Sequence, residues 1–191
     1  MGKLIYCAIT SLDGFVADQN GDFEWAMPSE EVHAFVNDIV RNVETSLLGR
    51  KMYEIMQVWD DMPTEGAGGP MDAPSEAMND YAKIWQSARK IVYSTSLSNL
   101  AISNATLEQK FDPEMLKKKL AETDKDFDIG GPQIAAEAIK AGLVDEYHQI
   151  IVPVMVGSGR YWLPQDVKLN LQLVDVRKFE NGFAYLHYRR F

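Results

Sequence analysis

Apolar residues recur along the chain with two different periods, one typical of buried strands and one typical of amphipathic helices. Residues 4–9 form a nearly continuous apolar run, which suits a central strand covered on both faces. Further along, apolar residues recur at helical spacing from Val32 to Val43. Ser29 stands where an N-cap is expected, and two glutamates follow it. This part of the chain therefore predicts a strand followed by a helix that packs on a sheet.

The same alternation of strand and helix signals continues toward the C-terminus. The further predicted strands are residues 45–48, 90–94, 127–129 and 147–156, and the further predicted helices are 50–58, one from 75, one from 112 and 132–142. Such alternation predicts a mainly parallel sheet with right-handed crossovers. Asn181-Gly182 predicts a terminal hairpin that adds an antiparallel strand at one edge. No repeat or linker interrupts the pattern, so we expect residues 1–191 to form a single α/β domain.

The composition excludes several classes of protein. Cys7 is the one cysteine and lies in an apolar run, so we expect a buried, inert thiol and no intrachain disulfide. No segment has the features of a signal peptide or reaches the ~18 apolar residues of a membrane span, so we expect a cytoplasmic protein. The net charge of −9 repels nucleic acid and anionic lipid, and neither is expected as a partner. A few local donors still suffice for a small phosphate ligand.

Three segments are predicted to meet at the carboxyl ends of the strands, where such sheets bind ligands. They are residues 49–51, 94–96 and 130–132. The two glycines at 130–131 allow backbone N–H groups to approach a pyrophosphate, although they also suit a plain strand-to-helix turn. Arg50, beside the hydroxyls of Ser94 and Thr95, suits a 2′-phosphate, although a solvated surface charge is the alternative.

Candidate acids follow the first strand and open the first helix. Asp13 comes just past the carboxyl end of the first strand. Glu30 and Glu31 favour the helix dipole, and a pocket-lining carboxylate is the second interpretation. Trp25 is expected either to pack in the core or to form a surface on which a ligand stacks. The three histidines, at positions 33, 148 and 187, show no spacing that pairs them into a metal site, and we predict none.

Four stretches occur in an order that carries a family resemblance. They are residues 11–14 (SLDG), 48–53 (LGRKMY), 90–95 (KIVYST), and 129–132 (IGGP) continued by 142–146 (GLVDE) and 152–159 (VPVMVGSG). Together they resemble the dihydrofolate reductase superfamily, and most closely the branch that includes the reductase domain of bacterial riboflavin biosynthesis. The resemblance spans almost the whole chain. It implies a three-layer sandwich whose central sheet has about eight strands, the last of them antiparallel.

The resemblance also implies a cofactor and a reaction. NADPH is expected to be bound by residues at the three segments named above: Gly49, Arg50, Lys51, Ser94, Thr95, Gly130, Gly131 and Pro132. Trp25 and Glu30 match substrate-side residues of folate enzymes, and Glu30, or alternatively Asp13, is expected to assist proton transfer. The implied function is an NADPH-dependent reductase of a small nitrogen heterocycle, most like 5-amino-6-(5-phosphoribosylamino)uracil reductase.

Three positions depart from the family patterns. Cys7 and Phe15 stand where riboflavin-pathway enzymes usually carry Lys and Arg, and Ile150 stands near a Thr of folate enzymes. A pterin reductase, a reductase of unrelated carbonyls or imines, and a non-catalytic ligand-binding protein therefore stay open as alternatives.

The oligomeric state is predicted from the resemblance and from the terminal hairpin. Riboflavin-type reductases commonly pair, so a homodimer is expected. Phe183, Tyr185 and Phe191 fall on one alternate set of positions and offer apolar surface for pairing, unless they pack inside the monomer.

Overall fold

One eight-stranded sheet organises the protein, whose computed structural model describes residues 1–65, 74–102 and 104–191. Its strands are β1 (Leu4–Ser11), β3 (Val43–Gly49), β4 (Arg89–Tyr93), β5 (Ala105–Glu108), β6 (Asp126–Gly130), β7 (Glu146–Val152), β9 (Leu171–Lys178) and β10 (Ala184–Arg190). Their order across the sheet is β5-β4-β3-β6-β1-β7-β10-β9. All pairs from β5 to β7 are parallel, and β10 is antiparallel to both of its neighbours.

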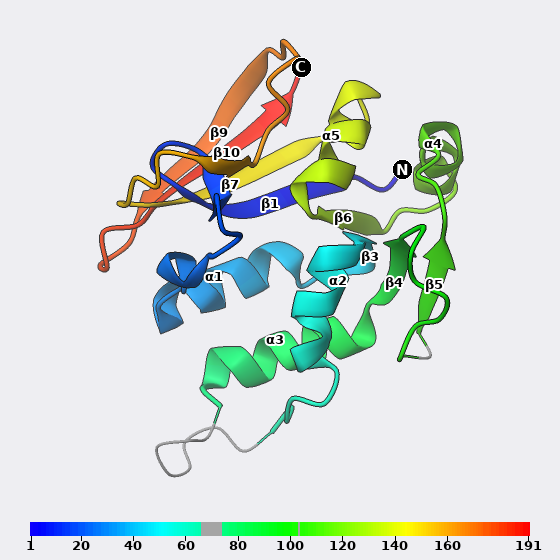
Figure 1. The fold of residues 1–191 in the computed structure, drawn as a ribbon, viewed down its shortest axis with the longest axis horizontal. Coiled ribbons are helices and arrows are strands. Elements are labelled where there is room, and N and C mark those ends of the chain that lie inside the picture. Colours follow the sequence, from blue (N-terminus) through cyan, green and yellow to red (C-terminus); the bar gives the residue numbers. More distant parts are fainter. Residues whose placement is uncertain (66–73, 103) are drawn as a thin grey trace.

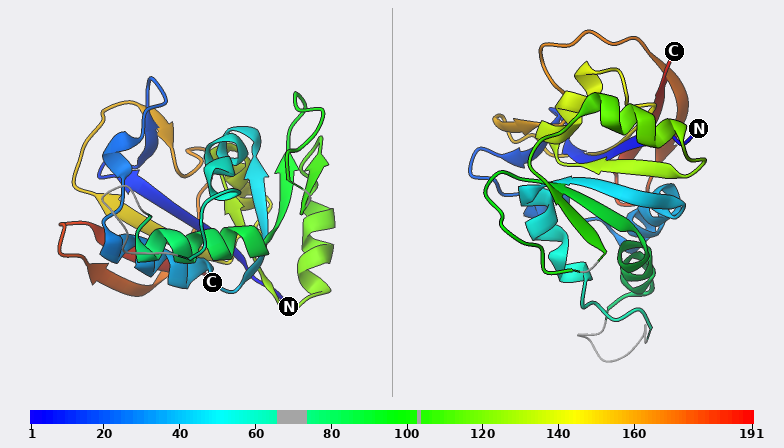
Figure 2. Two further views of the ribbon diagram at one scale, coloured as in Figure 1. Left: turned by 90° about the horizontal axis from the view of Figure 1, so that it is seen from below. Right: turned by 90° about the vertical axis from the view of Figure 1, so that its right-hand side faces the viewer.

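Helices cover both faces of this sheet. They are α1 (Glu30–Val40), α2 (Arg50–Met56), α3 (Glu76–Ser87), α4 (Pro113–Ala121) and α5 (Pro132–Lys140), with 3-10 turns η1 (Glu24–Ala26) and η2 (Gln57–Trp59). α1 and α3 lie on one face, and α4 and α5 lie on the other (Figures 1 and 2). This arrangement confirms the predicted three-layer α/β sandwich. None of the described helices is long and apolar enough to cross a membrane.

The first strand occupies the centre that its apolar run predicted. β1 pairs with β6 on one side and with β7 on the other. Leu4 and Tyr6 are buried in the core beneath α4 and α5, whereas Cys7 and Ile9 pack toward α1. Cys7 is only half-buried, although its surroundings raise the pKa of the thiol to about 12, mainly by desolvation, and keep it unreactive.

Several short strands were not predicted. β2 (Phe15–Asp18) and β8 (Gly159–Tyr161) form a separate two-stranded sheet, in which the rings of Phe15 and Tyr161 stack at 4.2 Å. β5 adds an edge strand beside β4. The strand predicted over 147–156 ends at Val152, because the chain leaves the sheet there to reach β8. Three- and four-residue strands are too short to show a period in sequence.

The hairpin predicted at Asn181-Gly182 forms, but the antiparallel strand lies one place inside the edge. β10 pairs with β7 through residues 184–189, and β9 takes the edge position. The hairpin therefore contributes two strands to the main sheet.

The aromatic residues offered for dimerisation do not form a shared surface. Phe183 and Tyr185 are 7% and 3% exposed and pack with Phe35 of α1 inside the monomer, whereas Phe191 is 83% exposed. The alternative stated for these residues is correct for the first two. The homodimer itself stays a prediction.

Replacing Phe183 with Ala should lower the free energy of unfolding by about 3 kcal/mol, because it empties a packed site in the core. The matched change Phe191→Ala should leave stability within about 0.5 kcal/mol, because that ring is exposed. Urea unfolding followed by circular dichroism measures both. Equal effects of the two changes would contradict the assignment of Phe183 to the monomer core.

Candidate active site

The strand register brings the three predicted cofactor segments to one edge of the sheet. Leu48 of β3 lies opposite Gly130 of β6, and Gly49 lies opposite Tyr93 of β4. The residues that follow each strand therefore start next to one another: Arg50 of α2, Ser94, and Gly131 before α5. The sequence predicted this meeting from the rule that parallel strands end at one edge of the sheet, and the structure confirms the meeting but not the ligand.

The helices at this edge begin without side-chain caps. α1, α3 and α4 are capped by Ser29, Ser75 and Asp112, whose side chains accept hydrogen bonds from first-turn amides. α2 and α5 begin instead after Gly49 and Gly131, and neither helix has a side-chain cap. Because the first amides of a helix need acceptors and form its positive end, this edge has two adjacent sets of donors suited to an anion.

Two glycines hold these helix starts close together. A Cβ on Gly130 would come 2.8 Å from Leu48 Cδ2 and 3.1 Å from Met52 Cγ. Gly131 has φ +102°, a conformation that other residues rarely adopt, and a Cβ there would lie 3.9 Å from the Gly49 amide nitrogen. Pro132 then occupies the first turn of α5, where its missing N–H removes no helical hydrogen bond. The glycines therefore keep backbone amides of both turns accessible.

One of the two basic side chains at this edge already forms an ion pair within the protein. Arg50 Nη1 donates to both carboxylate oxygens of Glu54, at 2.8 and 3.0 Å. Its side chain is 40% exposed, and the other guanidinium donors have no hydrogen-bond partner among the described residues. Lys51, the next residue, is exposed. A phosphate at Arg50 would thus share the guanidinium with Glu54.

The predicted hydroxyls differ in availability. Ser94 is buried, and its Oγ accepts hydrogen bonds from the amides of Ser96 and Leu97, both at 3.1 Å. The Ser94 hydroxyl therefore stabilises its own turn by accepting these two hydrogen bonds. Thr95 is exposed at the same turn and is the freer of the two predicted groups.

Asp13 stabilises the loop that follows β7. Its two carboxylate oxygens accept hydrogen bonds from the Val156 and Gly157 amides at 3.2 and 2.8 Å. A hydrogen bond from Ser11, followed by these amides, lowers its pKa. Asp13 is therefore ionised at neutral pH and fixes the loop over the carboxyl end of β1.

Glu30 links the starts of two helices. Its Oε1 accepts a hydrogen bond from the Ala77 amide at 2.8 Å, in the first turn of α3. Ser75 and then this amide lower its pKa, so the side chain is an ionised acceptor. Trp25 lies half-buried in η1, where Nε1 donates to the Asp22 carbonyl at 3.2 Å. Substrate-side roles of Glu30 and Trp25 stay predictions.

Asp128 is an acid that the sequence analysis missed. It lies on β6, two residues before Gly130, and on the sheet face that carries α1 and α3, as its register partners Ile5 and Ser46 show. Oδ1 is buried and has no hydrogen-bond partner among the described residues. Desolvation raises the pKa of Asp128 to about 6, against an opposing hydrogen bond from Ser46. A carboxyl group whose pKa lies close to neutrality is suited to proton transfer.

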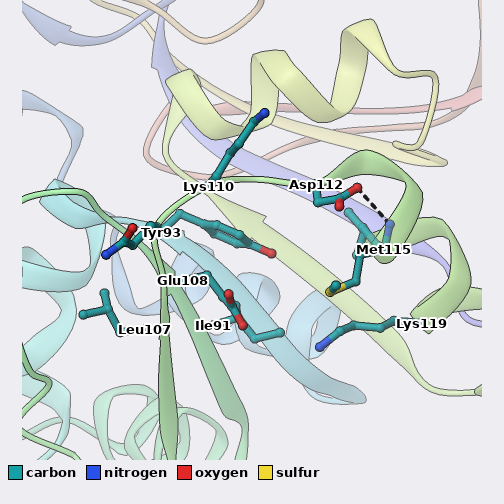
Figure 3. Close-up of a pocket in the computed structure, with 10 residues that line it drawn as sticks. Ile91, Tyr93, Leu107, Glu108, Lys110, Asp112, Met115 and Lys119 are labelled. Atoms are coloured by element: carbon teal, nitrogen blue, oxygen red, sulfur yellow. Dashed lines mark hydrogen bonds between the residues drawn. The ribbon is translucent and has the colours of Figure 1, made fainter.

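A cavity of about 430 Å³ lies beside the site and does not contain it. Figure 3 shows Tyr93 and Glu108 at the ends of β4 and β5, with Asp112 and Lys119 across the cavity on the α4 side. No predicted site residue lines it. The cavity has acidic and basic side chains in similar number and no convergent donor set, so the geometry at the strand ends is the better guide to the site.

Family membership agrees with this architecture. The sequence matches the model of the RibD C-terminal domain over residues 2–185. The chain belongs to this family. It is also 24% identical over 187 residues to YyaP, an uncharacterised protein of Bacillus subtilis (strain 168), in a match that covers 97% of this chain and 94% of YyaP.

Solved structures extend the likeness in fold. A putative riboflavin biosynthesis protein from Shewanella sp. PV-4 aligns with a TM-score of 0.73 at 18% identity, covering 100% of this chain and 99% of its own. The dihydrofolate reductase of Enterococcus faecalis, solved with NADP(H), aligns with a TM-score of 0.60 at 15% identity, covering 99% and 96%. Both confirm the dihydrofolate reductase-like fold that the sequence motifs implied.

The environment of Asp128 predicts a pH-dependent effect on stability. Its pKa is higher in the folded than in the unfolded protein, so ionisation disfavours folding, and this cost appears as pH rises from about 4 to about 7. Asp128→Asn should therefore stabilise the protein by about 1–3 kcal/mol at pH 8 and by much less at pH 4. The exposed Asp124→Asn serves as control, with no such trend. Urea unfolding at pH 4, 6 and 8 measures the difference, and a pH-independent effect of Asp128→Asn would contradict the raised pKa.

Proposed function

We propose that this protein is an NADPH-dependent oxidoreductase that reduces a small nitrogen heterocycle. The observation that carries the proposal is the pair of uncapped helix starts at Gly49 and Gly131, with Arg50 beside them. This donor set suits a pyrophosphate next to a second phosphate, which is the arrangement in NADPH. When bound, NADPH supplies the hydride. The family match and the NADP(H) complex of the Enterococcus faecalis enzyme support the same assignment.

The substrate side favours a heterocycle without a phosphate group. Phe15 is 4% exposed and stacks on Tyr161, and Cys7 packs in an apolar cluster. Neither residue can bind an anion at the positions where riboflavin-pathway enzymes usually carry basic side chains. We therefore favour an aminopyrimidine or pterin over a phosphoribosyl substrate.

The acidic side chains divide into acceptors and a proton holder. Glu30 is ionised, so its carboxylate suits hydrogen bonds from the N–H groups of an amino-heterocycle. Asp13 is ionised and committed to the loop after β7. Asp128, whose pKa of about 6 leaves it partly protonated near neutrality, is the best-suited proton donor of the three.

Cofactor preference tests the first part of the proposal. We expect the protein to bind NADPH more tightly than NADH, and Arg50→Ala to reduce that preference by about 1.5–3 kcal/mol, as for hydrogen bonds to charged groups. Glu54→Gln should increase the preference, because it frees the Arg50 guanidinium from a competing carboxylate. Isothermal titration calorimetry with both cofactors measures these affinities.

Arg89→Ala is the matched control for the cofactor experiment. Arg89 is exposed and opens β4, at the opposite end of the sheet from Ser94, so this change should leave both affinities unaltered. Equal affinity of the unmodified protein for NADPH and NADH would overturn the assignment of the 2′-phosphate to Arg50.

Turnover tests the roles of the acids. With an aminopyrimidine or dihydropterin substrate, Asp128→Asn should lower kcat by roughly 10²-fold and flatten the pH profile around 6, because it removes the proton donor. Glu30→Gln should mainly raise KM, since it weakens an acceptor for the substrate. A fall in kcat for Glu30→Gln, with Asp128→Asn fully active, would instead return the proton-donor role to Glu30.

A further inference from the structure

A cluster of two histidines and a glutamate lies on β7 and β10. Glu146 and His148 are on β7, and His187 lies directly opposite His148 on β10, the strand that runs beside β7 in Figure 1. β1 lies between β7 and β6, and Glu146 is level with Asp128 through Ile5, so the cluster is displaced from the cofactor segments across the sheet and not along the strands. None of the three residues belongs to the segments that follow β3, β4 and β6.

The three side chains present their donor atoms to a common point. The Oε2 atom of Glu146 lies 3.4 Å from His148 Nε2 and 3.6 Å from His187 Nε2. All three donor atoms lie within 4.8 Å of one another. Ligand atoms of a tetrahedral zinc ion, bound at about 2.0–2.1 Å, are separated by about 3.3 Å. The observed separations are close to that value and too long for strong hydrogen bonds to a carboxylate, which measure about 2.8 Å.

The histidine nitrogens that face this point lack partners. His148 Nε2 and His187 Nε2 are both buried without a hydrogen bond to any described residue. The His148 side chain is only 7% exposed, so water does not readily satisfy it. A buried unpaired ring nitrogen costs free energy, and native structures seldom leave two together. A bound cation would satisfy both at once.

The surroundings prepare the cluster for a cation. His148 Nδ1 lies 2.7 Å from the Tyr185 hydroxyl, which fixes the ring in the way that outer hydrogen bonds fix metal-binding histidines. The His148 and His187 rings stack with their centroids 4.1 Å apart. Lys3 binds the other oxygen of Glu146, Oε1, at 2.7 Å and leaves Oε2 free.

We propose that Glu146, His148 and His187 bind one divalent transition-metal ion, with Zn²⁺ as the best fit to this ligand set. Two imidazoles and a carboxylate are a common zinc ligand set, and water completes the tetrahedron. The rings are 16° from parallel, so binding requires the His187 ring to turn toward Oε2. His187 is 16% exposed, next to Glu146 at 19%, and the site opens to solvent on that side. The ion would join β7 to β10.

The sequence analysis predicted no metal site, because the ligands are far apart along the chain and lie on antiparallel strands. His148 and His187 are brought together only by the register of β10 on β7. No spacing in the sequence reveals that pairing.

Metal titration of the full chain, purified without a histidine tag and treated with a chelator, tests the proposal. We expect one Zn²⁺ per chain by competition with a chromophoric chelator, and visible absorption bands typical of tetrahedral Co²⁺ after cobalt substitution. His187→Gln and Glu146→Gln should each weaken Zn²⁺ binding by at least about 10-fold. Lys3→Met should strengthen it by roughly 5-fold or more, because it removes a positive charge beside the carboxylate.

His33→Ala is the matched control, because His33 is the one remaining histidine and packs on Trp59 and Tyr81 away from the cluster. This variant should bind Zn²⁺ as the unmodified protein does. Unchanged affinity in both ligand variants, or an equal loss in His33→Ala, would overturn the site. Circular dichroism and NADPH binding of every variant are recorded alongside. If zinc binding fails while NADPH binding is retained, the metal site is rejected and the proposed function is not.

Discussion

The close pairing of β3 with β6 is the constraint on which the proposed active site depends. Leu48 lies opposite Gly130, and a Cβ at Gly130 would come 2.8 Å from Leu48 Cδ2 and 3.1 Å from Met52 Cγ, so these side chains would have to shift. Because glycine lets the two strands end side by side, α2 and α5 begin side by side as well. The first amides of both helices then lie close together, and the positive ends of the two helix dipoles add to each other at this edge.

Three carboxyl groups of the same kind acquire different properties from their surroundings. Backbone amides of a helix start and of a loop hold Glu30 and Asp13 ionised. Asp128 lies on a buried strand with one oxygen unpaired, and desolvation raises its pKa to about 6. A reductase needs an acceptor that orients its substrate and an acid that keeps its proton, and environment rather than residue type separates these roles.

Parallel and antiparallel pairing give two parts of the sheet different chemistry. Parallel strands place the turns after β3, β4 and β6 at one edge, which collects glycines, hydroxyls and Arg50. β10 returns in the opposite direction and lays His187 against His148 near the start of β7. One sheet thus has an anion-suited edge at the ends of β3, β4 and β6 and a cluster suited to a cation on β7 and β10.

The sequence by itself determined the α/β class, most helix starts, the hairpin at Asn181-Gly182 and the meeting of residues 49–51 with 130–132. These features follow from periodicity, capping residues and the rule that parallel strands end at one edge. The tertiary structure decided that Phe183 and Tyr185 are core residues and that Asp128 is a partly protonated acid. It also decided that His148 faces His187. Periodicity shows which face of a strand a residue occupies, but register and packing decide what lies across from it, and pKa values and ligand sets depend on those neighbours.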